Sequence, residues 1–375
     1  MPTRASNDDA DLTIALNAHP RLSRPAVCRL VQELDRWRGA REPPERLATL
    51  IGVPRRQLER ALALAADSAR VSAAADRERA ESERLHARIV LEPEPSYPAA
   101  LRQLPLPPPV LYVRGELDSG PAVAIVGSRR ADAYGREVAE LFARALAAAA
   151  VTVVSGFAHG IDAAAHRGAL SAPGGRTVAV LGCGLGTDYP SGHASLGEEI
   201  AASGALLTEL PHGTGPRAWH FPVRNRIIAA LAAGTLVVQA APRSGSLVTA
   251  RHALDLGRQV WAVSGRIFDE RSLGPNALIR DGATPVQHPR EILEELLPAP
   301  GRLFDDTPLT PPAPLPEPPP GLSGEVFAAL PAGSTRAPEE LAIATGLAVD
   351  QVLGALLELE LGGWVKRKMG GVYGR

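Results

Sequence analysis

The sequence is poor in lysine and cysteine. Lys366 and Lys368 are its only lysines among 375 residues, so a phosphate-binding loop of the G-x-x-x-x-G-K-[ST] type is excluded upstream of them. Cys28 and Cys183 have neither disulfide nor metal-ligand spacing, which fits a reducing compartment. Because no group of histidines, cysteines and carboxylates has the spacing of a metal site, we expect neither a metal nor a cofactor.

Net charge and long apolar runs are also missing. The formal net charge of −1 provides no overall attraction to polyanions, so any polyanion site must be a local patch. Residues 1–11 are polar and acidic and lack the features of a secretion signal. The most apolar stretch, residues 146–154, is too short to span a bilayer. We therefore expect a cytoplasmic protein without membrane contact.

The N-terminal part, residues 1–88, predicts a small helical domain. Apolar residues recur at helical spacing in residues 25–37, and shorter helical patterns follow in residues 44–50 and 55–65. The charged segment 76–88 predicts a solvated helix or a linker. Residues 93–109 are rich in proline, which predicts an extended connector into the next domain.

Between residues 89 and 298, short apolar runs alternate with segments of helical length. The runs lie at residues 123–126, 151–154, 177–181, 205–210, 236–238 and 260–263, and the helical segments at 135–149, 161–170, 194–202, 223–232 and 247–256. Continuous apolar strands separated by helices indicate βαβ units. The sequence therefore predicts an α/β fold with a Rossmann-like, doubly wound, mostly parallel sheet.

The C-terminal part begins with a proline-rich segment, residues 299–321, which predicts a semi-rigid linker. Residues 322–375 predict a winged-helix domain, with helices at 323–330, 338–345 and 349–361 and a hairpin from 364–368 and 372–373. The third helix is acidic and has no basic residue, so it fits a DNA groove poorly. We expect this domain mainly to contact protein, with Lys366, Arg367 and Lys368 as the one DNA-facing patch.

Glycine-rich loops follow several of the predicted strands. In an open parallel sheet, ligands bind beyond the carboxyl ends of the strands, where loops lead into helix N-termini that attract anions. The loops are Gly127-Ser128-Arg129-Arg130, Ser155-Gly156, Gly182-Cys183-Gly184 and Arg243-Ser244-Gly245-Ser246. Several such loops side by side suit a chain of phosphates, although tight turns require glycine whatever they bind.

The segment from His220 to Ile228 has two arginines at the start of a predicted helix. Pro222 fits the first turn, which puts Arg224, Asn225 and Arg226 near the positive end of the helix dipole. Because Arg224 and Arg226 are two residues apart, they face different directions. We expect one of them to hold a phosphate and the other to pair with a carboxylate such as Glu209.

A possible catalytic pair, Asp162 and His166, follows the loop at Ser155. Their spacing of four residues puts both side chains on one helical face, but helix capping is the favoured interpretation of Asp162. No motif marks a serine or cysteine nucleophile beside them. The glycines at 182–186 do not match the dinucleotide fingerprint either.

Taken together, these segments resemble the DNA-processing protein A (DprA/Smf) family. The resemblance covers about residues 97–286 and is carried by Gly127-Ser128-Arg129, residues 155–166, Tyr189-Pro190, residues 221–228, Ser244-Gly245-Ser246 with Thr249-Ala250, and Gly282-Ala283. It implies an extended Rossmann fold that binds single-stranded DNA without known catalysis, forms a homodimer and loads the RecA recombinase in natural transformation. A SAM-like N-terminal domain and a C-terminal winged helix are also implied.

The resemblance also implies a set of DNA-binding residues. They are Ser128, Arg129, Ser155, Gly156, Phe157, Arg224, Asn225, Arg226, Ser244, Gly245, Ser246 and Thr249. The chain departs from the family at Gln239, where glutamate is usual, and at Ser264, where proline is usual. After Tyr189-Pro190, where relatives can have a basic residue, it has Ser191-Gly192-His193, and His193 is a candidate substitute.

Two alternatives use the same kind of sheet. One is a nucleotide-processing hydrolase of the lysine-decarboxylase-like Rossmann group, whose glycine-rich loop ends in a catalytic glutamate, whereas residues 244–251 contain no carboxylate. The other is a nucleotide sensor. Release of free base from a nucleoside monophosphate would support the hydrolase, and saturable mononucleotide binding without turnover would support the sensor.

Overall fold

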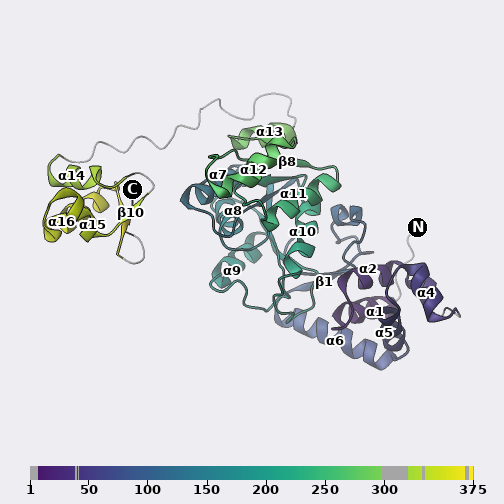
Figure 1. Ribbon diagram of the computed structural model, residues 1–375. Coiled ribbons are helices and arrows are strands. Elements are labelled where there is room, and N and C mark those ends of the chain that lie inside the picture. The colour runs from purple at the N-terminus through teal and green to yellow at the C-terminus, as the bar shows by residue number, and fades with distance from the viewer. Residues whose placement is uncertain are drawn as a thin grey trace. The chain divides into compact units, whose positions relative to one another are not determined.

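The computed structural model describes residues 7–38, 40, 42–297, 320–331, 334–367 and 371–374. The chain divides into two compact units, residues 1–300 and 301–375 (Figure 1). The expected linker at 299–321 lies almost entirely outside the described residues, as does Lys368. The first unit contains both the N-terminal helices and the large sheet, so the boundary expected after residue 88 stays a prediction.

The large sheet of the first unit has nine strands in the described chain, in the order β1-β2-β6-β5-β4-β3-β7-β8-β9. Strands β3 to β9 are parallel, whereas β1 and β2 form an antiparallel edge. The strands are β1 (Arg88–Leu91), β2 (Val110–Gly115), β3 (Ala122–Val126), β4 (Thr152–Ser155), β5 (Thr177–Val180), β6 (Ala205–Thr208), β7 (Gly234–Val237), β8 (Gln259–Ala262) and β9 (Thr284–Pro285).

Helices cover both faces of this sheet, which explains why its central strands are apolar throughout. Strands β3 to β7 are buried at every position. The helices are α7 (Ala133–Ala148), α8 (Ile161–Leu170), α9 (Ala194–Ser203), α10 (His220–Leu231), α11 (Gly245–Asp255), α12 (Glu270–Arg280) and α13 (Pro289–Leu296). The doubly wound, mostly parallel α/β fold predicted from the sequence is confirmed.

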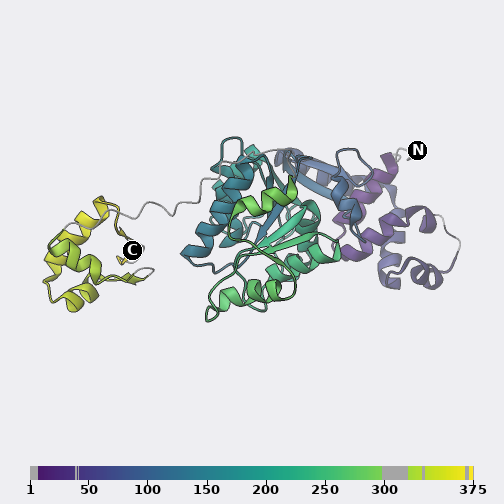
Figure 2. The ribbon, with the colours of Figure 1, turned by 90° about the horizontal axis from the view of Figure 1, so that it is seen from above.

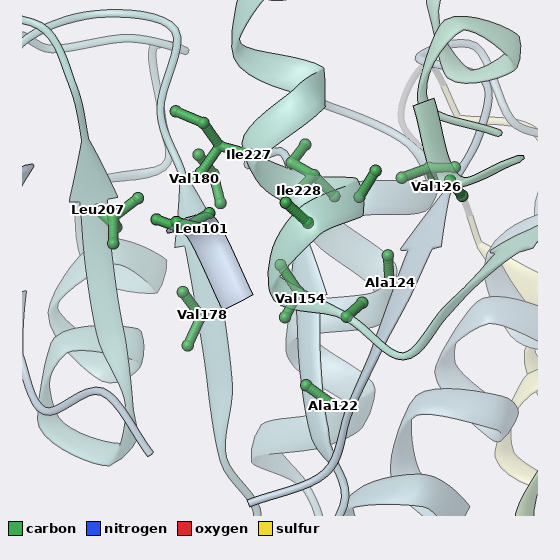
Figure 3. Close-up of a cluster of buried hydrophobic side chains, with 14 of the residues drawn as sticks. Leu101, Ala122, Ala124, Val126, Val154, Val178, Val180, Leu207, Ile227 and Ile228 are labelled. Carbon is green, nitrogen blue, oxygen red and sulfur yellow. The ribbon is translucent and has the colours of Figure 1, made fainter. Parts of the chain in front are cut away.

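Two apolar clusters hold the layers together. Ile227 and Ile228 of α10 pack with Val154, Val180 and other strand residues on one face (Figure 3). On the other face, α7, α8 and α13 pack against the alternate residues of the same strands. The carboxyl ends of β3, β4 and β7 thus come to one edge of the sheet with the N-termini of α8, α10 and α11 nearby.

The antiparallel edge was not expected from the sequence. The proline-rich connector predicted at residues 93–109 lies between β1 and β2 and contains a short 3₁₀ helix, Ala99–Gln103. The hydroxyl of Tyr97 donates a hydrogen bond to the Pro108 carbonyl at 2.9 Å, which ties the connector to itself. The apolar runs on either side of the prolines are short, so the prolines dominate the sequence pattern there.

The N-terminal helices contact the sheet directly (Figure 2). The Asn17 amide donates to the Glu209 carbonyl at 3.2 Å, and Ser82 Oγ lies 2.7 Å from His212 Nε2. The helices are α1 (Asn7–Ala18), α2 (Arg24–Gln32), α3 (Leu34–Trp37), α4 (Pro44–Ile51), α5 (Arg55–Ala65) and α6 (Ser68–Arg84). The charged segment expected as a helix or linker is therefore mostly helix.

The second unit matches the predicted winged-helix layout. Its elements are α14 (Leu322–Ala328), β10 (Thr335–Arg336), α15 (Pro338–Thr345), α16 (Val349–Leu361), β11 (Lys366–Arg367) and β12 (Tyr373–Gly374), and the small sheet has the order β10-β12-β11. Helix α16 buries Val352, Leu356 and Leu359 in the core, while Leu353, Leu357 and Leu361 are exposed.

A search of the described residues finds no single helix long and apolar enough to cross a bilayer. Helices α15 and α16 meet the length and composition criteria only as a pair, with a bend of 110° between them.

Replacement of Leu207 by alanine tests the packing of the sheet. Leu207 of β6 is fully buried, so its truncation leaves a cavity and should lower the free energy of unfolding by about 2–5 kcal/mol. Urea unfolding followed by circular dichroism measures the change. Leu50→Ala is the matched control, because Leu50 is 54% exposed on α4 and should change stability by less than about 0.5 kcal/mol. Equal effects of the two substitutions would contradict the packing described here.

Candidate functional site

A cavity of about 720 Å³ lies at the carboxyl edge of the sheet. We call it the sheet-edge cavity. Its walls come from the loop after β3, the start of α8, the segment leading into α10 and the loop after β7. The residues used below are Ser128, Arg129, Arg130, Asp162, Tyr189, Arg217, Phe221, Arg224, Asn225, Arg243, Ser244, Gly245, Ser246 and Thr249.

Backbone contacts hold the three strand-end loops against one another. The Ser128 N–H donates to the Gln239 carbonyl at 2.6 Å, and the Ile161 N–H donates to the Ser128 carbonyl at 3.2 Å. A Cβ atom on Gly127 would lie 2.5 Å from Ile161 and 2.8 Å from the Gln239 carbonyl, so only glycine fits between them. Three of the predicted strand-end segments, those after β3, β4 and β7, therefore meet at one edge.

Exposed arginines surround the cavity without carboxylate partners. Arg129, Arg130, Arg217 and Arg243 are exposed. In the part of the chain that the structure describes, no ion pair involves any of them. The guanidinium of Arg129 lies 4.8 Å from the centre of the Phe221 ring, a cation–π contact. The cavity therefore has a local positive charge despite the near-neutral chain.

Arg224 is different, because its guanidinium is already bound within the protein. It is 4% exposed and donates from Nη1 to the Gly156 carbonyl at 2.7 Å and to the Val180 carbonyl. Burial lowers its pKa to about 10, although nearby Asp162 opposes the change, so it stays charged at neutral pH. Arg224 thus connects the ends of β4 and β5 and forms part of the cavity floor.

Asp162 is the one carboxyl group among the described residues that line the cavity. Burial raises its pKa to about 6, although the positive charges of Arg224 and Arg129 act in the opposite direction. One carboxylate oxygen accepts a hydrogen bond from the Ala158 N–H at 3.3 Å. At neutral pH, Asp162 therefore cancels part of the arginine charge.

The N-termini of α10 and α11 both meet the cavity. Ser244 caps α11, since its side chain accepts a hydrogen bond from the Ser246 N–H at 3.4 Å. The Asn225 amide of α10 donates to the Gly245 carbonyl at 2.9 Å and fixes the loop after β7. Unpaired N–H groups at such helix ends attract anions.

The structure brings together most of the residues implied by the family resemblance, but not all. Ser128, Arg129, Arg224, Asn225, Ser244, Gly245, Ser246 and Thr249 line the cavity. Ser155 lies below it, fully buried, and donates to the Ile125 carbonyl at 2.6 Å. Gly156 and Phe157 lie outside the lining, and Phe157 is buried in an apolar cluster.

Arg226 faces the other side of α10. Its guanidinium forms a 2.6 Å ion pair with Glu209 and donates to the Leu106 carbonyl at 3.1 Å. It lines a separate, mostly apolar cavity of about 490 Å³. The expectation that one of the two helix arginines pairs with Glu209 is confirmed, and Arg226 is that arginine. Arg224, the arginine expected to hold a phosphate, instead donates to the Gly156 and Val180 carbonyls, and its phosphate contact stays a prediction.

Three arginines of the lining were missing from the predicted set: Arg130, Arg217 and Arg243. Arg130 and Arg243 belong to strand-end loops already recognised in the sequence, so their position was a usable signal. Arg217 lies in a segment without a motif, between β6 and α10, and only the folded chain brings it to the cavity. The loop at 182–184, by contrast, does not line the cavity.

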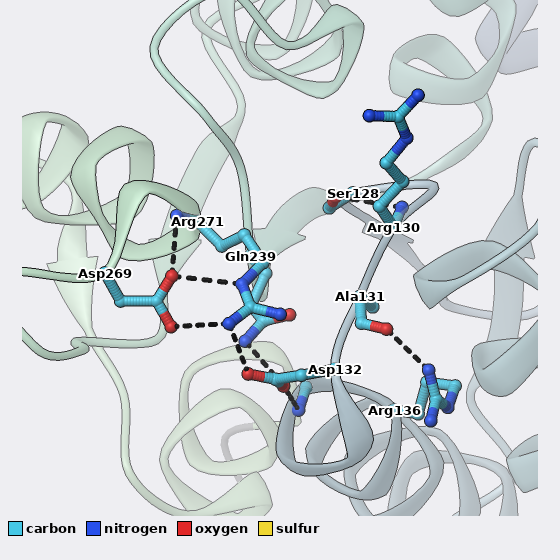
Figure 4. A network of polar contacts seen from close by, with 9 residues as sticks. Ser128, Arg130, Ala131, Asp132, Arg136, Gln239, Asp269 and Arg271 are labelled. Carbon is cyan, nitrogen blue, oxygen red and sulfur yellow. Dashed lines mark hydrogen bonds and ion pairs between the residues drawn. The ribbon is translucent and has the colours of Figure 1, made fainter.

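Gln239 links the loop after β7 to the start of α7 (Figure 4). Its amide donates to Asp132 at 2.9 Å, and Asp132 caps α7 and pairs with Arg271 at 3.0 Å. A glutamate would have no N–H for this contact.

The other two departures from the family lie outside the cavity lining. Ser264 is not a lining residue. His193 is 5% exposed, its pKa is lowered by burial, and it does not line the cavity, so it provides no basic group there.

The Asp162–His166 pair has no catalytic geometry. Nδ1 of His166 lies 2.7 Å from Thr177 Oγ1, and burial lowers the His166 pKa to about 3. Asp162 binds the backbone that precedes α8, in line with the favoured interpretation. No group of three or more potential metal ligands is found among the described residues.

Two aromatic rings line the cavity, and a third lies next to lining residues in the sequence. The Tyr189 and Phe221 rings are 5.4 Å apart, and both line the cavity. Trp219 lies between the lining residues Ala218 and Phe221 and is 51% exposed, with its ring 4.1 Å from that of His220. These rings offer flat apolar surfaces beside the arginines.

Comparison with known sequences identifies the family of this fold and site. The family described as DNA recombination-mediator protein A matches residues 88–297, and the DprA winged helix domain matches residues 310–371. The chain belongs to the DNA recombination-mediator protein A family. The sheet-edge cavity lies entirely within the first of these two matches.

Named relatives of the family agree with this assignment. Protein Smf of Escherichia coli is 42% identical over 290 residues, which cover 73% of this chain and 74% of that protein. DNA processing protein DprA of Bacillus subtilis is 40% identical, over 53% of this chain and 68% of its own. The X-ray structure of DprA from Streptococcus pneumoniae aligns with a TM-score of 0.62 at 30% identity, covering 78% of this chain and 99% of that one.

A second solved structure of the family carries a functional description. It is DNA processing protein A of Helicobacter pylori, whose structure is described in terms of a unique single-stranded DNA binding mode. It aligns with a TM-score of 0.52 at 30% identity, over 56% of this chain and 96% of that one.

Replacement of Arg224 by alanine should mainly affect stability. The substitution removes the donors to two carbonyls and leaves Asp162 without its buried counter-charge, so we expect a loss of about 3–5 kcal/mol in the free energy of unfolding at neutral pH. Arg129→Ala, at an exposed arginine of the same cavity, should cost less than about 1 kcal/mol. Denaturant unfolding distinguishes the two, and similar losses would mean that Arg224 does not hold the strand ends together.

Proposed function

We propose that the chain binds single-stranded DNA in the sheet-edge cavity and acts as a recombination mediator. The observation that carries the proposal is the set of exposed arginines, Arg129, Arg130, Arg217 and Arg243, which line the cavity and have no carboxylate partner among the described residues. The N-termini of α10 and α11 meet the same cavity. Guanidinium groups and helix N-termini are the usual protein ligands of phosphate. The description of the H. pylori relative as a binder of single-stranded DNA supports the same conclusion.

The lining favours an unpaired strand over a duplex or a mononucleotide. The lining arginines come from three separate segments and could each bind a different phosphate of one strand. A single nucleotide would leave most of these arginines without a phosphate. The Tyr189 ring offers a stacking surface that paired bases cannot reach, and base stacking on an aromatic ring contributes about 1–3 kcal/mol. Because phosphate contacts and stacking do not read the base edges, little sequence preference is expected.

Two finer parts of the proposal are loading of the RecA recombinase and formation of a homodimer. Membership in a family of recombination mediators supports the first. For the second, Ile267 and Phe268 before α12 are 72% and 96% exposed, which suits a subunit contact. We place this activity in the cytoplasm.

We further propose that the C-terminal winged-helix unit contacts protein rather than DNA. Helix α16 exposes Leu353, Leu357 and Leu361 on the face opposite its buried residues, with Asp350 and Glu360 beside them. An apolar and acidic helix face repels phosphates and suits a protein surface. Lys366 and Arg367 of β11 remain the described basic residues of the predicted DNA-facing patch.

The proposed activity does not include catalysis. Asp162 is held by Ala158 and Arg224, and the loop after β7 has no carboxylate near the position of a hydrolase glutamate. A nucleotide hydrolase of the lysine-decarboxylase-like group is therefore the less favoured function. No contact specifically favours a mononucleotide sensor.

The DNA proposal predicts a preference for single strands and a strong dependence on salt. Single-stranded oligonucleotides should bind more tightly than a duplex of the same length, and log affinity should fall with log salt by about 0.7 per phosphate contact. Arg129→Ala and Arg243→Ala should each reduce this slope by about 0.7 for all sequences alike. Fluorescence anisotropy titrations at several salt concentrations measure both quantities.

Arg251→Ala is the matched control for these variants. Arg251 lies on α11 and is exposed, like Arg243, which lies just before this helix. Unlike Arg243, Arg251 does not line the cavity. Its substitution should leave the slope unchanged. The proposal fails if single strands and duplex bind equally, or if Arg129→Ala and Arg243→Ala both keep the original slope.

The raised pKa of Asp162 predicts that acid strengthens DNA binding. Its carboxyl group is negative above about pH 6 and neutral below, so the described lining of the cavity loses its one negative charge as the pH falls. From about pH 7 to about pH 5, affinity should rise about threefold to tenfold, which corresponds to about 1 kcal/mol. Asp162→Asn should bind more tightly at neutral pH and show a smaller rise.

The asparagine variant also separates Asp162 from the nearby histidines. His159, His193 and His220 remain in the variant, so the difference between the two pH profiles isolates the carboxyl group. Parallel profiles for the two proteins would show that Asp162 does not control the charge of the cavity.

A further inference from the structure

A second hollow with a positive lining lies among the N-terminal helices. It has a volume of about 700 Å³ and lies between the end of α1 and helices α5 and α6. We call it the arginine hollow. Arg21, Arg60, Arg70 and Arg77 line it together with His19, and it shares no lining residue with the sheet-edge cavity.

The charges of the arginine hollow are largely uncompensated. In the described part of the chain, no ion pair involves Arg21, Arg60 or Arg77, and Arg70 approaches Asp67 only at 3.9 Å. Other arginines of the same helices do have close partners. Arg55 of α5 lies 2.6 Å from Glu59, and Arg84 of α6 lies 2.6 Å from Glu81. The lining arginines therefore differ from Arg55 and Arg84, whose charges are compensated on the same helices.

Backbone carbonyls orient two of the guanidinium groups. Arg60 Nη1 donates to the Arg21 carbonyl at 2.8 Å, and Arg77 Nε donates to the Ala73 carbonyl at 3.2 Å. No further hydrogen bond of these two side chains is found among the described residues. Each therefore keeps N–H donors for a ligand while its position is partly fixed, which reduces the entropy lost on binding.

The positive charges of these arginines also affect His19, the histidine of the hollow. The His19 pKa is lowered, first by burial and then by the positive charges of Arg60 and Arg70. Its Nδ1 already accepts a hydrogen bond from the Arg21 N–H at 3.2 Å. Three separate segments of the chain thus bring positive charge to one concave surface, whereas solvated arginines would spread apart.

The remaining lining indicates what kind of anion fits. The floor is apolar and small, with Ala15, Leu64 and Ala74. Among the described lining residues there is no aromatic ring apart from the His19 imidazole, so the hollow offers no platform for stacked bases. Its volume and its several arginines exceed what a single phosphate needs. A nucleic-acid strand that contacts the hollow through several phosphates, and not through its bases, meets these conditions.

We propose that the arginine hollow is a second nucleic-acid site, which binds the phosphate backbone of DNA independently of the sheet-edge cavity. Because it contacts no bases, it binds duplex as well as single strands. The protein then holds duplex through its N-terminal helices and an unpaired strand through its sheet. This proposal goes beyond the function proposed for the cavity and does not require it to be correct.

The test compares three double variants of the full chain. Arg60→Ala with Arg70→Ala alters the hollow, and Arg129→Ala with Arg243→Ala alters the cavity. Arg55→Ala with Arg84→Ala removes the same charge from paired arginines of α5 and α6. Each protein is titrated with a labelled DNA duplex at several salt concentrations, and unfolding curves verify that the variants fold.

We expect the hollow variant alone to lose duplex binding. The slope of log affinity against log salt should fall by about 1.8, or about 0.9 for each lost contact, while the other two variants keep the original slope. Arg60→Lys with Arg70→Lys retains both charges and should keep most of the slope even if the alanine variant is unstable. Unchanged duplex affinity and slope in the hollow variant would overturn the proposal.

A polyglutamate probe distinguishes a protein ligand from a nucleic acid. If the hollow serves an acidic protein segment, the hollow variant loses polyglutamate binding but keeps its affinity for duplex, which would also overturn the proposal. Loss of single-strand binding in the cavity variant is measured separately, so failure of one proposal leaves the other standing.

Discussion

The buried guanidinium of Arg224 is the contact on which the rest of the site depends. It joins the carbonyls at the ends of two neighbouring strands and faces the only carboxyl group of the described cavity lining. Strand ends carry backbone oxygens that repel one another and repel anions. A cation fixed below them neutralises both effects, so the surface above can accept phosphates.

This arrangement divides the arginines by role. Arg224 and Arg226 bind partners within the protein. Arg224 donates to backbone carbonyls, and Arg226 forms an ion pair with Glu209. The arginines of the strand-end loops have no such partners in the described chain and face the cavity. The distinction rests on geometry, because all these residues carry the same charge.

Much of the fold was predictable because parallel strands covered on both faces are apolar without interruption. Runs such as residues 123–126, which alternate with segments of helical length, fit strands that are buried on both faces. The antiparallel edge was missed because prolines obscure the short runs that flank them. In the site, glycine and serine at the strand ends marked the loops after β3 and β7 correctly, whereas the glycines at 182–184 marked a loop that does not line the cavity. The bound state of Arg224 could not be predicted, since its partners lie 44 and 68 residues away along the chain.

The four tryptophans happen to sample different environments of the protein. Trp37 and Trp261 are buried in the helical part and in the sheet, whereas Trp219, between the lining residues Ala218 and Phe221 in the sequence, is half exposed. Indole emission shifts with solvent contact and is quenched by stacked bases. The fourth, Trp364, is partly buried in the second unit. A change of the Trp219 emission on addition of DNA can thus report occupancy of the cavity without any dye attached to protein or ligand.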